Sequence, residues 1–230
     1  MLQQTSVPRV MAKYGTFIRA FPSLRSLALA SVQDVLAAWK GLGYNRRALA
    51  LHSAAKIIVR DRGGRIPRTL EELSRLPGLG VATASSVLVF SHDVPLPFIE
   101  TNVRRVFIHF FFPGRDSVSD AEIVPLVEKT LDRSRPREWY YALMDYGAML
   151  GRTDKNANRR SRTYVRQSRF EGSLRQLRGR VLDVMLRLGS ADAAGIQSEL
   201  PEPDQRLATA LDQLVSEGFL RRRGNRYYFR

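Results

Sequence analysis

The chain has 230 residues, which is room for one large domain or two modest ones. It carries 37 basic and 22 acidic side chains, a formal net charge of +15 that favours a polyanionic partner, most often nucleic acid. No apolar run approaches membrane-spanning length, and the opening MLQQTSVPRV lacks the pattern of a signal peptide. The absence of cysteine excludes disulfides, iron–sulfur clusters and thiol nucleophiles, and the three scattered histidines predict no metal site. We therefore expect a cytoplasmic protein without a cofactor.

Residues 1–150 are predicted to be all-α, with short helices joined by tight turns. Ser31 is a candidate N-cap for a helix that reaches Trp39, and apolar spacing predicts another helix over 45–60. Thr69 followed by Glu72 is typical of a capping box at the start of a helix. Further helices are predicted at 83–91, 120–131 and 137–150.

The positive charge is concentrated in residues 151–180, which hold ten basic and two acidic residues. A solvated linker is one interpretation, but the density of arginine, with Tyr164 and Phe170 between, favours contact with phosphates. We expect 151–173 to be a segment that contacts DNA. Its candidate contacts are Arg159, Arg160 and Arg162.

The region 174–230 predicts three helices and a hairpin. An amphipathic helix over 174–188 ends at Gly189, Ser190 is a candidate cap for a short helix, and a third helix opens near Asp204. Two short strands about residues 224–225 complete the pattern of a winged helix-turn-helix. Such domains also serve structural or dimerising roles. The basic wing favours DNA, with Arg222 and Arg223 as its candidate contacts.

The most informative segment is LPGLGVATA at 76–84. Its Pro-Gly-x-Gly turn lets backbone amides approach a ligand, and the following helix points its N-terminus at the same place. Alone, this pattern is also met in a plain turn. Together with PFIETNVRRVF, MLQQTSV, GLGY and YALMDYGAML, however, it resembles the helix-hairpin-helix DNA glycosylase superfamily, and within it the MutY-type adenine glycosylases. The resemblance implies a two-lobed, all-α fold over 1–150.

The resemblance also implies which residues bind DNA. Gly78, Gly80 and Thr83 match the hairpin that holds the DNA backbone, commonly with a monovalent cation on its backbone carbonyls. Gln4 matches a residue that wedges into the base stack, Gln3 is its neighbour, and Tyr44 matches an aromatic residue that inserts beside the orphaned base. A core tyrosine is the alternative for Tyr44.

Glu100 stands where the superfamily places its catalytic aspartate. An anion there stabilises an oxocarbenium-like transition state or orients water, but glutamate projects one methylene further. The alternative is a glutamate that stabilises only the helix N-terminus. Ala82 occupies the position of the Schiff-base lysine of bifunctional relatives, so the resemblance implies a monofunctional hydrolase.

Three further departures from the family are apparent. The glutamate that protonates adenine would lie two residues before Met1, so the N-terminus is expected to be truncated by a misplaced start. The four cluster cysteines of many relatives are absent, and a winged helix stands where a Nudix-like domain often ends the chain.

The expected function is removal of a flipped, mismatched base from double-stranded DNA, best of all adenine opposite 8-oxoguanine or guanine. The alternatives are a uracil or thymine mismatch glycosylase and a non-catalytic DNA-binding protein. In a prokaryote the protein would be associated with the nucleoid, and no protein partner is predicted.

Overall fold

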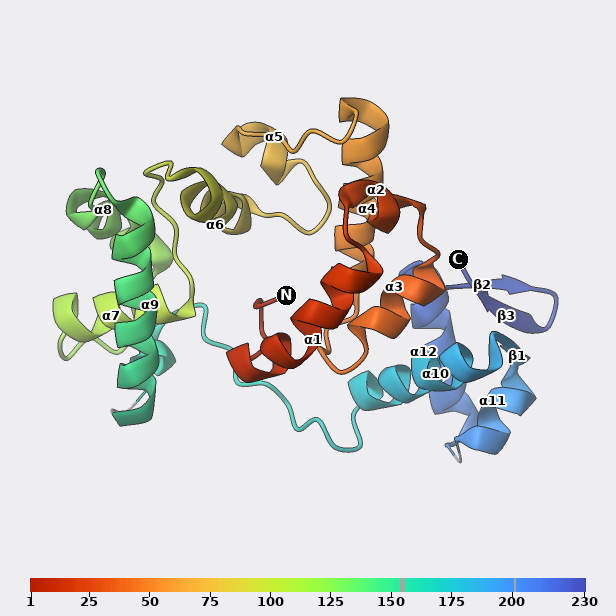
Figure 1. The fold of residues 1–230 in the computed structure, drawn as a ribbon. Helices are drawn as coiled ribbons and strands as arrows, with labels where there is room; N and C mark the ends of the chain where they lie inside the picture. The colour runs from red at the N-terminus through yellow and green to blue at the C-terminus, as the bar shows by residue number, and fades with distance from the viewer. Residues whose placement is uncertain (154–155, 201) are drawn as a thin grey trace. The chain divides into compact units, whose positions relative to one another are not determined.

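The computed structural model describes residues 1–153, 156–200 and 202–230, and the chain divides into two compact units (Figure 1). One unit consists of Met1–Ile66 with Ser168–Arg230, and the other of Pro67–Gln167. These units cut the chain at other places than the predicted boundaries of 1–150, 151–173 and 174–230. The reason is that the first 66 residues and the C-terminal region share one hydrophobic core.

The N-terminal part of the first unit is helical, as predicted. Ser31 caps the third of its helices by accepting a hydrogen bond from the Asp34 N–H at 3.0 Å. The fourth ends at Gly63, whose φ of 58° lies in the left-handed region that favours glycine. The helices are α1 (Val7–Ala20), α2 (Leu24–Leu29), α3 (Val32–Trp39) and α4 (Arg46–Arg62).

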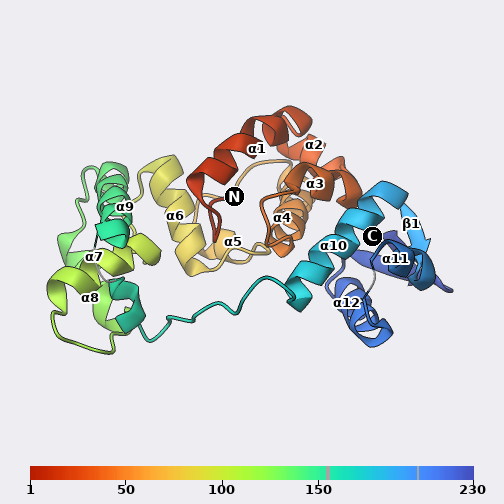
Figure 2. The same ribbon diagram turned by 90° about the horizontal axis from the view of Figure 1, so that it is seen from below.

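The C-terminal part of the first unit combines helices with three short strands (Figure 1), of which Figure 2 shows β1 beside α11. The strands form an antiparallel sheet in the order β1-β3-β2, and the predicted hairpin is its β2–β3 pair. The expectation for Ser190 was wrong: it pairs with Tyr228 in β1, and Asp192 caps the next helix by accepting from the Gly195 N–H at 2.8 Å. The elements are α10 (Leu174–Leu188), β1 (Ser190–Asp192), α11 (Ala193–Glu199), α12 (Asp204–Ser216), β2 (Leu220–Arg223) and β3 (Arg226–Phe229).

One core joins the two parts of the first unit. Trp39 and Leu42 from the N-terminal helices belong to the same buried cluster as Met185 and Leu211 from α10 and α12. Burial of such side chains is the main favourable contribution to folding. At the edge of this core, Lys40 forms a 3.0 Å ion pair with Asp183, which contributes little because both side chains are about half exposed.

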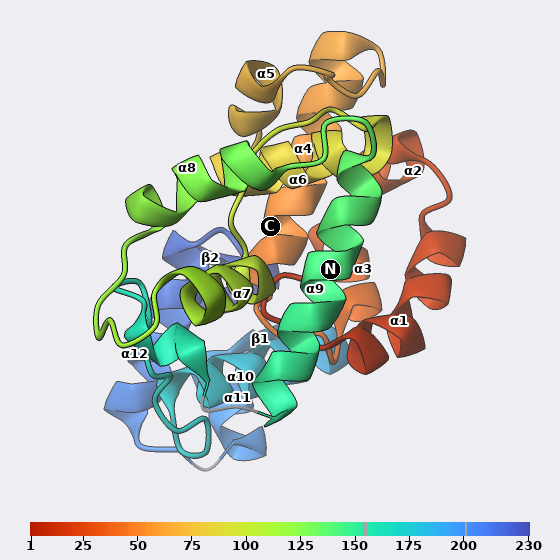
Figure 3. The same cartoon turned by 90° about the vertical axis from the view of Figure 1, so that its left-hand side faces the viewer.

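The second unit is also helical, and its helices α7 and α9 pack closely together (Figure 3). Thr69 accepts from the Glu72 N–H at 3.3 Å and so caps α5 as predicted. None of the helices in the described ranges combines the length and the apolar character that crossing a bilayer requires. The elements are α5 (Leu70–Ser74), α6 (Val81–His92), α7 (Thr101–Phe111), α8 (Asp120–Thr130), α9 (Pro136–Thr153) and the 3₁₀ turn η1 (Ala157–Arg160).

Gly147→Ala is expected to destabilise the second unit by about 1–3 kcal/mol, because overpacking a tight contact forces the backbone to shift. A Cβ at Gly147 in α9 would lie 2.5 Å from the backbone oxygen of Asn102 in α7. Thermal denaturation measures the effect. Gly179→Ala is the matched control, since no atom lies within 4 Å of that Cβ. The control is expected to gain up to about 1 kcal/mol from the helix propensity of alanine. Equal melting temperatures for the two variants would contradict the close packing of α7 on α9.

Candidate functional site

The segment between α5 and α6 is a tight turn that ends at a helix N-terminus. Gly78 has a φ of 75°, which glycine adopts without strain, and Gly80 is the N-cap of α6. The Leu79 N–H donates to the Leu76 carbonyl oxygen at 3.2 Å and closes the turn. Val81, at the first position of α6, is 64 % exposed. The turn therefore presents the positive end of α6 at the surface, which is an arrangement that suits an anion.

Glu100 is the N-cap of α7. Its Oε1 accepts hydrogen bonds from the N–H groups of Asn102, at 2.7 Å, and Val103, at 2.9 Å. Within the described part of the chain, no group donates to its Oε2, and the side chain is only half-buried. One oxygen is thus committed to the helix, and the other is available to a ligand. The capping bonds hold the carboxylate in a fixed orientation.

The loop that leads to Glu100 is fixed by Tyr140 of α9. The Tyr140 hydroxyl accepts from the Phe98 N–H at 2.8 Å and donates to the Leu96 carbonyl at 3.0 Å. The Tyr140 and Phe98 rings stack with centroids 4.0 Å apart. Burial raises the pKa of Tyr140 to about 12, so the hydroxyl stays protonated and can donate at neutral pH. The backbone two residues before Glu100 is therefore held from a distant helix.

The first turn of α7 is held by a second set of polar contacts. The side-chain amide of Asn158, a buried residue of the turn η1, donates to the Thr101 carbonyl at 2.9 Å. Arg105 donates to Asn102 Oδ1 at 2.9 Å and to the Gly147 carbonyl. Side chains of η1 and of α7 itself, with a backbone carbonyl of α9, therefore hold the start of the helix that Glu100 caps. Sequence reasoning missed Asn158 and Tyr140, whose partners lie more than 40 residues away.

The three candidate arginines of residues 151–173, the basic segment, have different surroundings. The Arg160 guanidinium donates to the carbonyls of Phe112, at 2.7 Å, and Ile108, at 3.2 Å, and so caps the C-terminal end of α7. Arg159 and Arg162 are exposed, and Arg162 donates to the Ser117 hydroxyl at 3.2 Å. Arg160 is thus engaged within the second unit, whereas the other two side chains reach solvent.

In the first unit, two predicted site residues have strained backbones. Gln4 has a φ of 56° and Tyr44 a φ of 48°, both in the left-handed region. Such a conformation costs about 1–3 kcal/mol and persists only where the surroundings enforce it, most often at functional sites. Tyr44 is 43 % exposed, so it is not a core tyrosine. Gln3 and Gln4 are also exposed, in the turn that precedes α1.

The basic residues of the β2–β3 hairpin lie at the surface. Arg221, Arg222 and Arg223 are all exposed on β2. The Arg222 guanidinium lies over the Tyr227 ring, 5.8 Å from its centroid, and donates to the Gly224 carbonyl at 2.9 Å. The β2–β3 hairpin therefore presents exposed positive charge on a paired strand.

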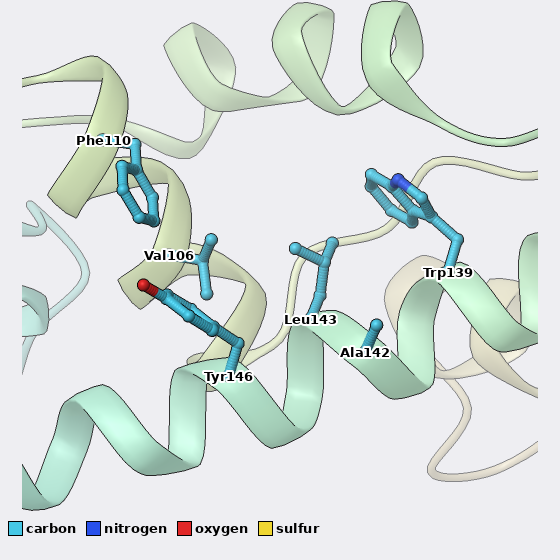
Figure 4. Close-up of a pocket in the computed structure, with 6 residues that line it drawn as sticks. All are labelled: Val106, Phe110, Trp139, Ala142, Leu143 and Tyr146. Carbon is cyan, nitrogen blue, oxygen red and sulfur yellow. The ribbon is translucent and has the colours of Figure 1, made fainter.

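An apolar groove of about 450 Å³ lies between α7 and α9. Figure 4 shows that Phe110 and Tyr146 approach each other across it, with Val106, Leu143, Ala142 and Trp139 along its length. None of the predicted site residues lines this groove. It carries no ionisable group other than a phenol, so it lacks the chemistry of a polar reaction site.

Comparison with known proteins identifies the family. Residues 1–126 match the profile described as HhH-GPD superfamily base excision DNA repair protein. The chain belongs to this superfamily. The adenine DNA glycosylase of Mycolicibacterium smegmatis is 33 % identical over 96 % of this chain and 81 % of its own length. The adenine DNA glycosylase of Mycobacterium tuberculosis H37Rv is 34 % identical over 80 % of this chain and 67 % of its own length.

Solved structures support the same fold. A thermostable thymine-DNA glycosylase superposes with a TM-score of 0.60 at 23 % identity, covering 64 % of this chain and 70 % of its own. A trapped endonuclease III–DNA covalent intermediate gives a TM-score of 0.52 at 23 % identity, covering 66 % and 70 %. The predicted helix-hairpin-helix glycosylase fold is confirmed, and the chain is a base-excision repair glycosylase of this superfamily with a small C-terminal sheet. Because it has no cysteine, it holds no cysteine-ligated iron–sulfur cluster.

Proposed function

We propose that this chain is a monofunctional glycosylase that removes adenine from double-stranded DNA where adenine is paired with 8-oxoguanine or guanine. The choice of adenine as substrate is supported by sequence similarity to adenine DNA glycosylases. For the relative from Mycolicibacterium smegmatis, this similarity extends over 96 % of the chain. In the reaction, water adds to C1′ of the flipped nucleotide, and the electron pair of the N9–C1′ bond leaves with adenine. The attacking water releases one proton and the departing adenine takes up one proton, so the hydrolysis balances.

Glu100 is the proposed catalytic carboxylate. Its Oε2 accepts no hydrogen bond from the described residues, while Oε1 anchors it to α7. An anion fixed in this way costs no reorganisation when positive charge develops at the sugar, which is the condition for electrostatic stabilisation of a transition state. Ala82, in place of a lysine, supports hydrolysis without a Schiff base.

The proposed DNA contacts belong to four surfaces. The α5–α6 turn with Gly78, Gly80 and Thr83 would bind a phosphate at the N-terminus of α6, and its backbone carbonyls would hold the monovalent cation that the family resemblance implies. In the first unit, the two turns that contain Gln4 and Tyr44 would contact the base stack. The basic segment and the wing would add phosphate contacts. The residues of these last three surfaces are Gln3, Gln4, Tyr44, Arg159, Arg160, Arg162, Arg222 and Arg223.

The C-terminal module, residues 174–230, is proposed to be a winged helix whose wing is the β2–β3 hairpin. It would increase the affinity for the duplex. Its order of helix, strand, two helices and two strands, with the sheet order β1-β3-β2, supports this assignment. The exposed arginines of β2 support a contact with the DNA backbone rather than with base edges. No cofactor is required by the proposed reaction.

Single-turnover excision on a panel of duplexes tests the proposal. The panel holds adenine opposite 8-oxoguanine or guanine, and uracil, thymine or hypoxanthine in mismatches, with alkali to cut abasic sites. It is run with the 230-residue chain and with a form that includes any residues encoded in frame before Met1.

Cleavage at adenine by either form supports the proposal. Cleavage at uracil or thymine alone would replace it with a different mismatch specificity. No cleavage by either form, with salt-sensitive binding retained, would favour a non-catalytic DNA-binding protein and leave Glu100 as a helix cap.

A further inference from the structure

Arg47, in the first turn of α4, joins two segments that are far apart in the sequence. Its guanidinium donates to the Met1 carbonyl at 2.6 Å and to the Gln3 carbonyl in the N-terminal turn. It also donates to the Gly43 carbonyl at 3.1 Å, directly before Tyr44. The guanidinium therefore bonds the backbone of two turns that lie 40 positions apart in the sequence.

Thr5 completes the link. The Arg47 guanidinium donates to the Thr5 hydroxyl at 2.7 Å, and that hydroxyl donates to the Leu42 carbonyl at 3.0 Å. The same guanidinium lies over the rings of Trp39 and Tyr44, 5.4 and 5.5 Å from their centroids. The N-terminal turn and the Gly41–Tyr44 turn thus form one polar cluster with the half-buried arginine at its centre.

Two non-glycine residues with left-handed backbone flank this cluster. In the described part of the chain, only Gln4, Tyr44 and Asp93 are non-glycine residues with positive φ. Gln4 follows a carbonyl that Arg47 binds, and so does Tyr44. Left-handed backbone at such residues persists only where contacts over-determine it, and the bonds from Arg47 to the two preceding carbonyls are contacts of that kind.

We propose that Arg47 is a positioning residue that clamps the Gln4 and Tyr44 turns into one rigid wedge for unstacking DNA. This inference rests on the proposed function, since it assigns Gln4 and Tyr44 to the base stack. Arg47 itself need not touch DNA: its Nη1 and Nη2 groups bond four backbone carbonyls and one hydroxyl, and its Nε is buried. A lysine cannot reproduce this fork, because its ammonium is a single point of donation.

Arg47→Met is the principal variant, and Arg60→Met is its matched control. The control removes the same charge from the same helix at its other end, where the guanidinium pairs with Asp61 on the surface. Amide hydrogen exchange on the free protein is measured first. The peptides that span residues 1–6 and 40–46 are expected to exchange faster in Arg47→Met than in Arg60→Met or the wild type.

Base unstacking is measured next, by the fluorescence of 2-aminopurine placed beside the mismatch. The wild type and Arg60→Met are expected to raise the fluorescence on binding, and Arg47→Met to lose most of that rise. Single-turnover excision is expected to fall at least tenfold in Arg47→Met, with Arg47→Lys between the two. In a Tyr44→Ala background, Arg47→Met is expected to lower the rate less than twofold further, because a residue that acts through Tyr44 has little left to position.

The outcomes separate this inference from the proposed function. Exchange and fluorescence that are unchanged in Arg47→Met would overturn the clamp even if the wild type excises adenine. A full additional loss in the Tyr44→Ala background would also overturn it, since that result marks a general structural role. Absence of excision by the wild type contradicts the proposed function alone, and the exchange and fluorescence results then decide the clamp.

Discussion

Glu100→Gln is expected to lower the single-turnover rate of base excision by about 100- to 1,000-fold, the cost of removing one fixed electrostatic stabiliser from a transition state. The amide oxygen of glutamine can still accept from the N–H groups of Asn102 and Val103, so the cap on α7 is retained. The variant loses the negative charge at the position of Oε2, the oxygen that accepts no hydrogen bond from the described residues. Affinity for the mismatched duplex, measured at the same salt concentration, is expected to change little.

Glu100→Asp is the matched variant. Aspartate is among the preferred N-cap residues, so the melting temperature is expected not to fall, and the carboxylate is kept one methylene further back. A displacement near 1 Å can cost about 100-fold in rate, so a loss smaller than that of the Gln variant is expected. If the Gln variant excises as fast as the wild type while Glu100→Ala lowers the melting temperature, Glu100 is only a helix cap.

Local signals predicted the helices well. Ser31 and Thr69 cap the helices that their side chains indicated, because an N-cap depends on groups only two or three residues away. Ser190 illustrates where such a signal fails. Its three-residue strand exists because β3 pairs with it across nearly 40 residues, and no local pattern shows that partner. Asp192, two positions later, provides the cap instead.

The site was predictable where a short motif encodes it. The turn at Gly78 and the carboxylate of Glu100 follow from contiguous residues, whereas the groups that hold them do not. Tyr140 and Asn158 reach the loop before α7 and its first residue from 42 and 57 positions away. Arg47 was within reach of a sequence argument, since it lies only three residues after Tyr44, in the first turn of α4. What the sequence could not show was the N-terminal turn on its other side.

The segment after α9 shows how this chain secures α7 without cysteine ligands. The Val118 N–H donates to the Arg160 carbonyl at 2.8 Å, and the Arg162 N–H donates to the Val118 carbonyl at 2.9 Å. Together with the buried side chain of Asn158, these bonds fix the turn η1 against the second unit. The basic segment therefore has two roles: its backbone near η1 and the side chains of Asn158 and Arg160 hold it in the second unit, whereas its exposed side chains, those of Arg159 and Arg162 included, are available to a polyanion.

Duplex affinity is expected to fall steeply with salt, by about 10³- to 10⁵-fold between 50 and 200 mM if six to ten phosphates are contacted. The net charge of +15 and the exposed arginines of the basic segment and the wing are the basis of this expectation. Titration of a fluorescent duplex at a series of salt concentrations measures the slope of log affinity against log salt. A flat dependence would remove the basic segment and the wing from the interface.

Variants of two neighbouring arginines make the salt experiment more specific. Arg159 is exposed, whereas Arg160 is bonded to carbonyls at the end of α7. Arg159→Gln is expected to reduce the slope by about 0.9, the value for one phosphate contact on duplex DNA, without altering the melting temperature. Arg160→Gln removes a group that binds the carbonyls of Ile108 and Phe112, so it is expected to destabilise the second unit. If the slope falls equally in both variants and neither melts earlier, Arg160 contributes its charge to DNA and its bonds to α7 are dispensable. If only Arg160→Gln weakens binding, the contact is made through the folded segment rather than through its exposed charge.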